Sequence, residues 1–249
     1  MKSAASPKTL FNIVRDIPSL DMFENMSRGE VQFMSKFKMG EFVAQPGTEI
    51  LAQGASSSQL YTALDGMGLR FKMLEDGSRQ VVGFILPGDF IGLQSGVMGT
   101  MRHSVEATTI MTMCVFNRSE LWNLFSQQPQ RAFDLTHIAA TEEHLLGEML
   151  AAVGQMDGMA KIAWVLNRFY TRLSALGLNQ NDQVPLPYKQ QDIADAMGLS
   201  LVHTNKTLAK LRSQGIATWA EDTLTVHQPK ELADLGFSNN IMTQARPLI

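Results

Sequence analysis

The fold is decided by the stretch from residue 190 to residue 208, which reads QQDIADAMGLSLVHTNKTL. Ala194 is small where two helices must cross closely, and Gly198, four residues later, can adopt the left-handed conformation that ends a helix. Ser200 can cap a second helix by accepting a hydrogen bond from an amide of its first turn. The apolar residues that would hold the two helices together are Ile193, Leu208 and Leu211. This arrangement predicts a helix-turn-helix, whose second helix enters the major groove of DNA.

The second predicted helix, from Ser200 to about Ser213, carries a local positive charge. Its basic residues are Lys206, Lys210 and Arg212, and residues 200–212 contain no acidic residue, although the whole chain has a net charge of −3. Two short strands follow at Ile216–Thr218 and Thr223–Val226, and they predict the hairpin of a winged helix-turn-helix. A basic face that is merely solvated is the alternative, but the turn spacing and the hairpin favour binding to double-stranded DNA.

The composition of the 249 residues is that of a globular protein, with 45% apolar and 18% charged residues. The single cysteine, Cys114, excludes an internal disulfide and a four-cysteine zinc or iron–sulfur site within the chain. No apolar run reaches the ~20 residues that a membrane span needs, and the N-terminal stretch lacks the apolar core of a secretory signal. We therefore expect a cytoplasmic protein without a membrane partner. The sequence has no phosphate-binding loop, His-Glu-x-x-His motif or Gly-x-Ser-x-Gly elbow, so neither an enzyme nor a metal site is predicted.

The chain as a whole predicts an α+β protein in three parts: a β-rich domain (1–128), one long helix (129–157) and the helix-turn-helix domain (158–249). Between about residues 37 and 116, short apolar strands alternate with glycine and acidic turns. Leu69, Phe71 and Met73, for example, share one face of a strand that precedes the turn at residues 75–77. Strands at this spacing predict a sandwich or barrel. The end of the chain, Phe237–Ile249, is polar and is expected to be frayed.

The long helix has a narrow stripe of residues at alternating three- and four-residue spacing. The stripe comprises Leu135, Ile138, Glu142, Leu145, Met149, Ala152 and Met156, of which six are apolar. Such a seam is typical of a two-stranded coiled coil, and it predicts a homodimer paired through this helix. A helix that packs within its own chain would give the same pattern, and this alternative stays open.

The order of these features resembles the cyclic-AMP receptor protein / fumarate-nitrate reduction regulator (CRP/FNR) superfamily of transcription factors. The resemblance covers roughly residues 20–240 and depends on motifs in sequence order. They are the turns at Gly54 and Asp65-Gly66, the segment Pro87-Gly88-Asp89-Phe90-Ile91-Gly92, the long helix, and Gln190–Ala194 with Gly198-Leu199-Ser200. The resemblance implies a homodimeric regulator with a cyclic-nucleotide-binding-type β-roll, similar to a jelly roll, a dimerisation helix and a C-terminal winged helix-turn-helix. It also implies a near-palindromic DNA site and contact with RNA polymerase.

The segment that holds the nucleotide in cyclic-nucleotide-responsive members departs from the family pattern. Leu93 stands where those members have a glutamate for the ribose, and Met101 stands where they have an arginine for the cyclic phosphate. Methionine cannot replace a bidentate guanidinium, and the adjacent Arg102 would face the opposite side of a strand. We therefore expect that cyclic AMP does not activate the protein, and that its small-molecule effector is unknown. The candidate effector-pocket residues are Gly92, Leu93, Gln94, Arg102, His103 and Ser104.

Other readings of the cofactor and function stay open. One is a regulator of the same family that responds to a cyclic nucleotide, or to a gas through haem held by His103, His137, His144 or a methionine. The iron–sulfur branch of the family requires a cysteine cluster that this chain lacks. Another reading is a nucleotide-binding regulatory module without DNA binding. The basic helix and the wing argue against such a module, which would have no use for them.

The second helix of the motif also departs from the usual family sequence. Its base-reading positions carry Leu201, Val202 and Lys206, where the family has arginine or valine, then glutamate, then arginine. Leu201 and Val202 suit thymine methyl groups, Lys206 suits guanine O6 or N7, and Asn205 suits adenine. Lys189 replaces the usual helix cap and is a candidate for a phosphate contact. The predicted DNA-binding residues are Lys189, Gln190, Ser200, Leu201, Val202, His203, Asn205, Lys206 and Lys210.

Overall fold

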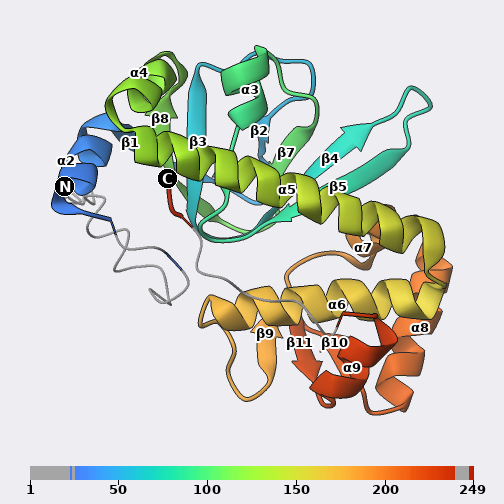
Figure 1. Ribbon diagram of the computed structural model, residues 1–249. Helices are drawn as coiled ribbons and strands as arrows, with labels where there is room; N and C mark the ends of the chain where they lie inside the picture. The colour runs from blue at the N-terminus through green and yellow to red at the C-terminus, as the bar shows by residue number, and fades with distance from the viewer. Residues whose placement is uncertain (1–22, 24–25, 239–246) are drawn as a thin grey trace, which may run out of the picture. The chain divides into compact units, whose positions relative to one another are not determined.

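The computed structural model describes residue 23, residues 26–238 and residues 247–249 (Figure 1). Within these limits the chain divides into two compact units. The first unit comprises the described residues within 1–70, 84–139 and 245–249, and the second comprises those within 71–83 and 140–244. The tip of one N-terminal hairpin is therefore grouped with the helix-turn-helix. Among the described helices, none is both long and apolar enough to cross a lipid bilayer.

Two four-stranded sheets form the β-roll. The first has the strand order β1-β8-β3-β6, and the second has the order β2-β7-β4-β5. The strands are β1 (Lys38–Ala44), β2 (Glu49–Leu51), β3 (Gln59–Asp65), β4 (Gly68–Met73), β5 (Arg79–Ile85), β6 (Phe90–Ile91), β7 (Ser104–Ala107) and β8 (Met111–Asn117). The central strand β8 pairs antiparallel with both β1 and β3. The predicted roll of short strands is thus confirmed.

The core of the roll contains residues from both sheets. Its buried members are Ala44, Leu51, Tyr61, Ala63, Ile85, Ile91, Met101, Val105, Ala107, Met111, Met113 and Val115. In β8 the period of two residues turns Cys114 and Phe116 to the opposite face, where Phe116 stacks on Phe37 with ring centroids 5.1 Å apart. Burial raises the pKa of the Cys114 thiol to about 12, so this thiol stays protonated. Met73, which the alternation placed on one strand face with Leu69, is 44% exposed, whereas Leu69 is 1% exposed.

Short helices flank the strands of the first unit. They are α2 (Arg28–Phe37), α3 (Leu93–Met98) and α4 (Leu121–Gln127), and the 3₁₀ turn η2 (Arg118–Glu120) precedes α4. Helix α2 begins with a capping box, in which the amide of Ser27 donates to Glu30 Oε2 at 2.7 Å and the amide of Glu30 donates to Ser27 Oγ at 3.3 Å. The side chain of Phe37 lies at the other end of this helix and is buried.

Residues 247–249 are buried in the first unit, and the prediction of a frayed end is wrong for them. Leu248 and Ile249 are each 3% exposed. Arg131, near the start of the long helix α5 (Pro129–Gln155), pairs with Glu30 (Nε–Oε1 3.0 Å) and Asp134 (Nη2–Oδ2 2.7 Å) and donates to the carbonyl of Leu248 at 3.5 Å. The segment was predicted to fray because most of its residues are polar, but its last two residues, Leu248 and Ile249, are apolar and buried. The part of the predicted frayed segment at 239–246 lies outside the described residues.

Helix α5 confirms the predicted long helix, and the chain itself buries two residues of its predicted seam. Leu135 and Ala152 are buried, and the other seam residues within α5 are each partly buried. The large apolar side chains that α5 leaves exposed are Phe133 (65%), Leu146 (50%) and Leu150 (73%). The seam therefore stays a prediction, and Leu146 and Leu150 add exposed apolar surface beside it.

The second unit is a winged helix-turn-helix, as predicted. Its elements are α6 (Gly158–Ala175), β9 (Gln183–Pro185), α7 (Gln190–Met197), α8 (Leu201–Ser213), β10 (Ala217–Ala220), β11 (Thr223–Val226) and α9 (Pro229–Leu235). The wing is a three-stranded sheet in the order β10-β11-β9. Glu221 and Asp222 form its turn with positive φ angles of 51° and 56°, and Trp219 Nε1 donates to the carbonyl of Leu186 at 3.1 Å. Helix α6 contacts both α8 and α9 (Figure 1).

Candidate nucleic-acid interface

The turn between α7 and α8 is built by the residues that predicted it. Gly198 has φ +62° and ψ +39°, and the amides of Gly198 and Leu199 both donate to the carbonyl of Ala194. A residue with a side chain is strained in this left-handed conformation, which is why glycine suits the position. Ser200 Oγ accepts the amide of His203 at 3.2 Å and caps α8. The two helices are therefore fixed at both sides of the turn by local hydrogen bonds.

Helix α8 has one buried and one exposed face. Its buried side chains are Thr204, Thr207, Leu208 and Leu211, and the helix contacts α7, whose buried residues include Ile193, Ala194 and Met197. On the exposed face, Val202, Lys206 and Lys210 follow one another at intervals of four residues, and Val202 is 65% exposed. Leu201 (39% exposed) and the exposed Asn205 flank this row. The exposed face thus combines apolar groups for thymine methyls with amine and amide groups for base edges.

His203 differs from the other predicted DNA-binding residues in its surroundings. A Cβ atom on Gly158, the first residue of α6, would lie only 2.0 Å from His203 Nε2. The imidazole therefore rests against the start of α6, at the edge of the exposed face of α8.

The start of α7 brings Lys189 and Gln190 together with Asp192. The side chain of Lys189 is exposed and has no acceptor with which to cap the helix. Asp192 supplies the other half of a cap, because its Oδ2 accepts the amide of Lys189 at 2.8 Å. The sequence indicated that Lys189 cannot cap α7 with its side chain. Asp192, three positions later, compensates for this in part.

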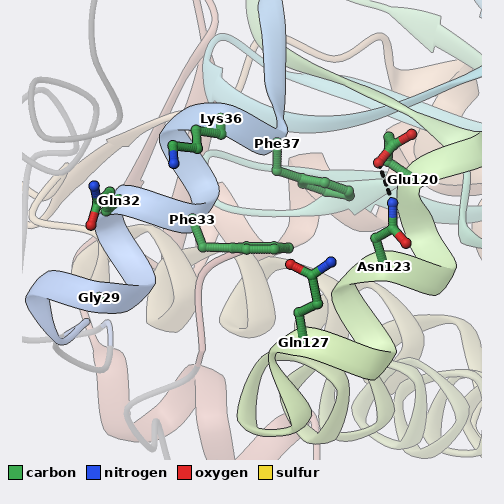
Figure 2. A pocket seen from close by; sticks show the side chains of 8 residues that line it. All are labelled: Gly29, Gln32, Phe33, Lys36, Phe37, Glu120, Asn123 and Gln127. Atoms are coloured by element: carbon green, nitrogen blue, oxygen red, sulfur yellow. Dashed lines mark hydrogen bonds between the residues drawn. The ribbon is translucent and has the colours of Figure 1, made fainter.

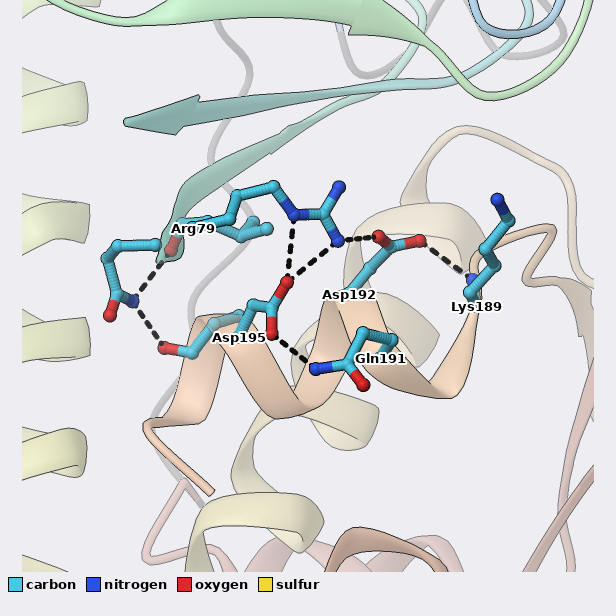
Figure 3. A network of polar contacts seen from close by, with 8 residues as sticks. Arg79, Lys189, Gln191, Asp192 and Asp195 are labelled. Carbon is cyan, nitrogen blue, oxygen red and sulfur yellow. Dashed lines mark hydrogen bonds and ion pairs between the residues drawn. The ribbon is translucent and has the colours of Figure 1, made fainter. Parts of the chain in front are cut away.

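Arg79, an arginine of the β4–β5 hairpin, forms ion pairs with two aspartates of α7. Sequence reasoning missed this arginine. Its Nη2 lies 2.5 Å from Asp192 Oδ1, and its Nε lies 2.8 Å from Asp195 Oδ2 (Figure 3). Burial lowers the pKa of Arg79, but the ion pairs with the two aspartates outweigh it and raise the pKa above its usual value. The three-residue spacing of the aspartates was visible in the sequence, but a partner 113 residues away was not.

The candidate effector residues lie around α3 and β7. Gln94 Oε1 accepts the amide of Arg102 at 3.0 Å, so the structure brings these two residues together. Ser104 is buried and its Oγ accepts the amide of Gln53 at 2.9 Å, which makes it part of the framework. Met101, at the family's arginine position, is 1% exposed in the core, whereas Arg102 is exposed. Gly92 is the N-cap of α3 with φ +96°, Leu93 is the first residue of this helix, and His103 is partly buried.

Residues 41–128 match the family described as cyclic nucleotide-binding domain, and residues 160–235 match the Crp-like helix-turn-helix domain. The nitrogen fixation regulation protein FixK of Bradyrhizobium diazoefficiens is 30% identical over 200 residues, which are 80% of this chain and 78% of the relative. The chain belongs to the CRP/FNR family. A second relative of this regulator, the transcriptional activatory protein AadR of Rhodopseudomonas palustris, is 30% identical over 74% of this chain and 76% of its own. The solved structure of FixK2 from Bradyrhizobium japonicum has a TM-score of 0.72 at 27% identity and covers 78% of this chain and 96% of that one.

Membership of the CRP/FNR family confirms the function predicted from the sequence at its general level. This CRP/FNR protein is a DNA-binding transcription regulator, and its relatives are regulators rather than enzymes. Dimers are typical of the family. Among the residues that the structure describes, no three histidine, cysteine, aspartate or glutamate side chains are grouped to hold a metal ion.

A pocket of about 400 Å³ lies on the first unit of the CRP/FNR chain, outside the core of the roll. Figure 2 shows it between α2 and α4, with the stacked rings of Phe33 and Phe37 on one side and the hydrogen-bonded Asn123 and Glu120 on the other. Its lining residues are Gly29, Gln32, Phe33, Lys36, Phe37, Glu120, Asn123 and Gln127. The lining shares no residue with the candidate effector set.

Proposed function

We propose that this regulator binds a near-palindromic DNA site as a homodimer, with the two copies of α8 in successive major grooves about 34 Å apart. The observation that carries the proposal is the exposed row of Val202, Lys206 and Lys210 on a helix that is capped and fixed by its turn. In the division that we propose, residues 1–128 sense the signal, residues 129–157 pair the two chains, and residues 158–249 bind DNA. The protein would act in the cytoplasm together with RNA polymerase.

The bases that α8 would read follow from its exposed side chains. Val202 replaces a glutamate that accepts a hydrogen bond from cytosine, so we infer thymine at that contact and guanine opposite Lys206. Gln190, Ser200, Leu201, His203 and Asn205 would complete the contacts. Lys189, Lys210 and Arg212 supply charge to the phosphates, and binding is therefore expected to weaken steeply with salt.

Lys206→Ala is expected to weaken binding to the specific site by about 10- to 100-fold, because it removes a base contact and a positive charge. A duplex selected by the wild-type protein from a randomised pool, followed by fluorescence anisotropy, measures this change. Lys230→Ala on α9 removes the same charge from an exposed position of the same unit and serves as the control. An equal loss of affinity on unrelated DNA would show that Lys206 contacts phosphate only. An unchanged affinity would exclude α8 as the reading helix.

The second proposal concerns the effector: we infer that cyclic AMP is not the activating ligand. Support comes from the position of Met101, whose apolar side chain is buried in the core where a phosphate-binding arginine would be needed. The ligand that replaces cyclic AMP is an unidentified small molecule.

Anisotropy on DNA from the gene's own upstream region, with and without cyclic AMP, tests this inference. We expect tight binding without nucleotide and the same dissociation constant in its presence. Binding that requires cyclic AMP would contradict the inference, and it would indicate that Arg102, which is exposed beside Met101, has taken the role of the phosphate ligand.

A further inference from the structure

The hairpin of β4 and β5 carries an arginine whose guanidinium packs against an aromatic ring of the same hairpin. Arg79 is the first residue of β5, and its guanidinium lies 5.8 Å from the centroid of the Phe71 ring on β4. Its side chain is 25% exposed. An arginine that is packed on a ring loses little freedom when it forms ion pairs, so its fork is already oriented toward α7.

Helix α7 presents two carboxylates to this fork (Figure 3). The side chain of Asp192 is only 4% exposed, and its two oxygens serve different partners, Arg79 and the amide of Lys189. Asp195 likewise accepts from Arg79 through Oδ2 and from Gln191 Nε2 through Oδ1 at 2.5 Å. One guanidinium thus connects the cap of α7 with the middle of the same helix.

A third contact extends the attachment to the end of α7. Gln80, the next residue of the hairpin, donates from Nε2 to the carbonyl of Ala196 at 3.2 Å. Residues 71–83 accordingly belong to the same compact unit as the helix-turn-helix, although they lie inside the region that matches the cyclic nucleotide-binding domain. The hairpin therefore contacts α7 at its start, its middle and its end.

The charge balance decides what the loss of Arg79 would do. A carboxylate as buried as Asp192 is stable only if it is paired and hydrogen-bonded. Without Arg79, Asp192 and Asp195 would place two uncompensated negative charges on the helix that crosses the DNA backbone in a helix-turn-helix. These charges would repel the phosphates, and the cap at Lys189 would lose the partner that orients Asp192.

We propose that Arg79 is a positioning residue for DNA binding: it holds α7 in place and neutralises Asp192 and Asp195 next to the DNA backbone. Part of the sensing domain is in this way a structural part of the DNA-binding surface. The inference uses the DNA binding of the family and does not depend on the proposed dimeric site or on the identity of the effector.

The test compares Arg79→Ala, Arg79→Lys, Asp195→Asn and the double variant Arg79→Ala/Asp195→Asn. Fluorescence anisotropy uses a duplex that the wild-type protein selected from a randomised pool, which establishes DNA binding before any variant is measured. Thermal unfolding gives the melting temperature of each variant, and binding is measured at a temperature at which all of them are folded. Lys72→Ala is the matched control, because it removes one exposed positive charge from the same hairpin.

We expect Arg79→Ala to weaken binding on the order of tenfold, and Arg79→Lys to weaken it less, since lysine keeps the charge but not the fork. In the wild-type background, Asp195→Asn should change the DNA affinity little, because Arg79 still forms its ion pair with Asp192. In the Arg79→Ala background the same substitution should increase affinity, because it removes a charge that repels phosphate. This reversal of sign is the readout that a purely structural role would not produce.

Several results would overturn the proposal. Tighter binding by Arg79→Ala would show that the hairpin holds α7 away from DNA, and unchanged binding would show that it does not act on α7. A loss equal to that of Lys72→Ala would reflect net charge alone. Losses that follow the melting temperatures, without the reversal at Asp195, would reduce Arg79 to a stabilising residue.

Discussion

Replacing Leu146 and Leu150 with glutamate should convert the protein from a dimer to a monomer and weaken its binding to a palindromic site by more than about 100-fold. The two side chains are 50% and 73% exposed and lie one turn apart on α5, so they share one face. In a two-fold symmetric interface each substitution occurs twice, and four carboxylates would meet where apolar groups should be buried. Each monomer would then bind only one half-site.

Analytical ultracentrifugation measures the change in mass, and anisotropy on full-site and half-site duplexes measures the change in affinity. Affinity for the half-site should be retained, which distinguishes lost pairing from lost folding. Val97→Glu/Met98→Glu is the control, because it adds the same charge to exposed apolar residues of α3 (67% and 57% exposed). A variant at Leu146 and Leu150 that remains dimeric would place the interface elsewhere.

The seam residues of α5 differ in how far their own chain covers them, for a physical reason. A stripe with three- and four-residue spacing is the same pattern whether its own chain or a second chain covers it. Leu135 and Ala152 are covered by the chain itself, whereas Leu146 and Leu150 are not. Only the three-dimensional contacts separate these cases, and for this reason the sequence predicted the helix but could not show which of its apolar residues the chain itself covers.

The helix-turn-helix could be predicted to within a residue because its signals are local. Gly198 and Ser200 form their hydrogen bonds within five residues along the chain, so the sequence contains all the partners. The ion pairs of Arg79 join residues 113 and 116 positions apart, and no local pattern encodes them. The burial of Leu248 and Ile249 in the first unit was missed for the same reason. What sequence reasoning found at the candidate site is therefore the part that neighbours along the chain determine.

Gly66 joins β3 to β4, and its surroundings leave no space for a side chain. Its φ angle is +82°, and a Cβ atom there would lie 2.1 Å from the carbonyl oxygen of Ile110 and 2.8 Å from Met111 Cα. The turn cannot easily move away, because the next residue, Met67, donates its amide to Thr109 Oγ1 at 2.8 Å. A methyl group at Gly66 would therefore meet backbone atoms in a segment that is fixed by hydrogen bonds.

Gly66→Ala is accordingly expected to lower the free energy of unfolding by about 3 to 4 kcal/mol, of which the left-handed backbone accounts for about 1 and the clash for the rest. Gly54→Ala separates the two contributions, because Gly54 has the same backbone conformation (φ +83°) and a methyl group there would have nothing within 4 Å. That variant should lose only about 1 kcal/mol. Urea unfolding followed by circular dichroism measures both changes. Equal losses would mean that the backbone angle alone matters and that the β3–β4 turn can move away from Ile110.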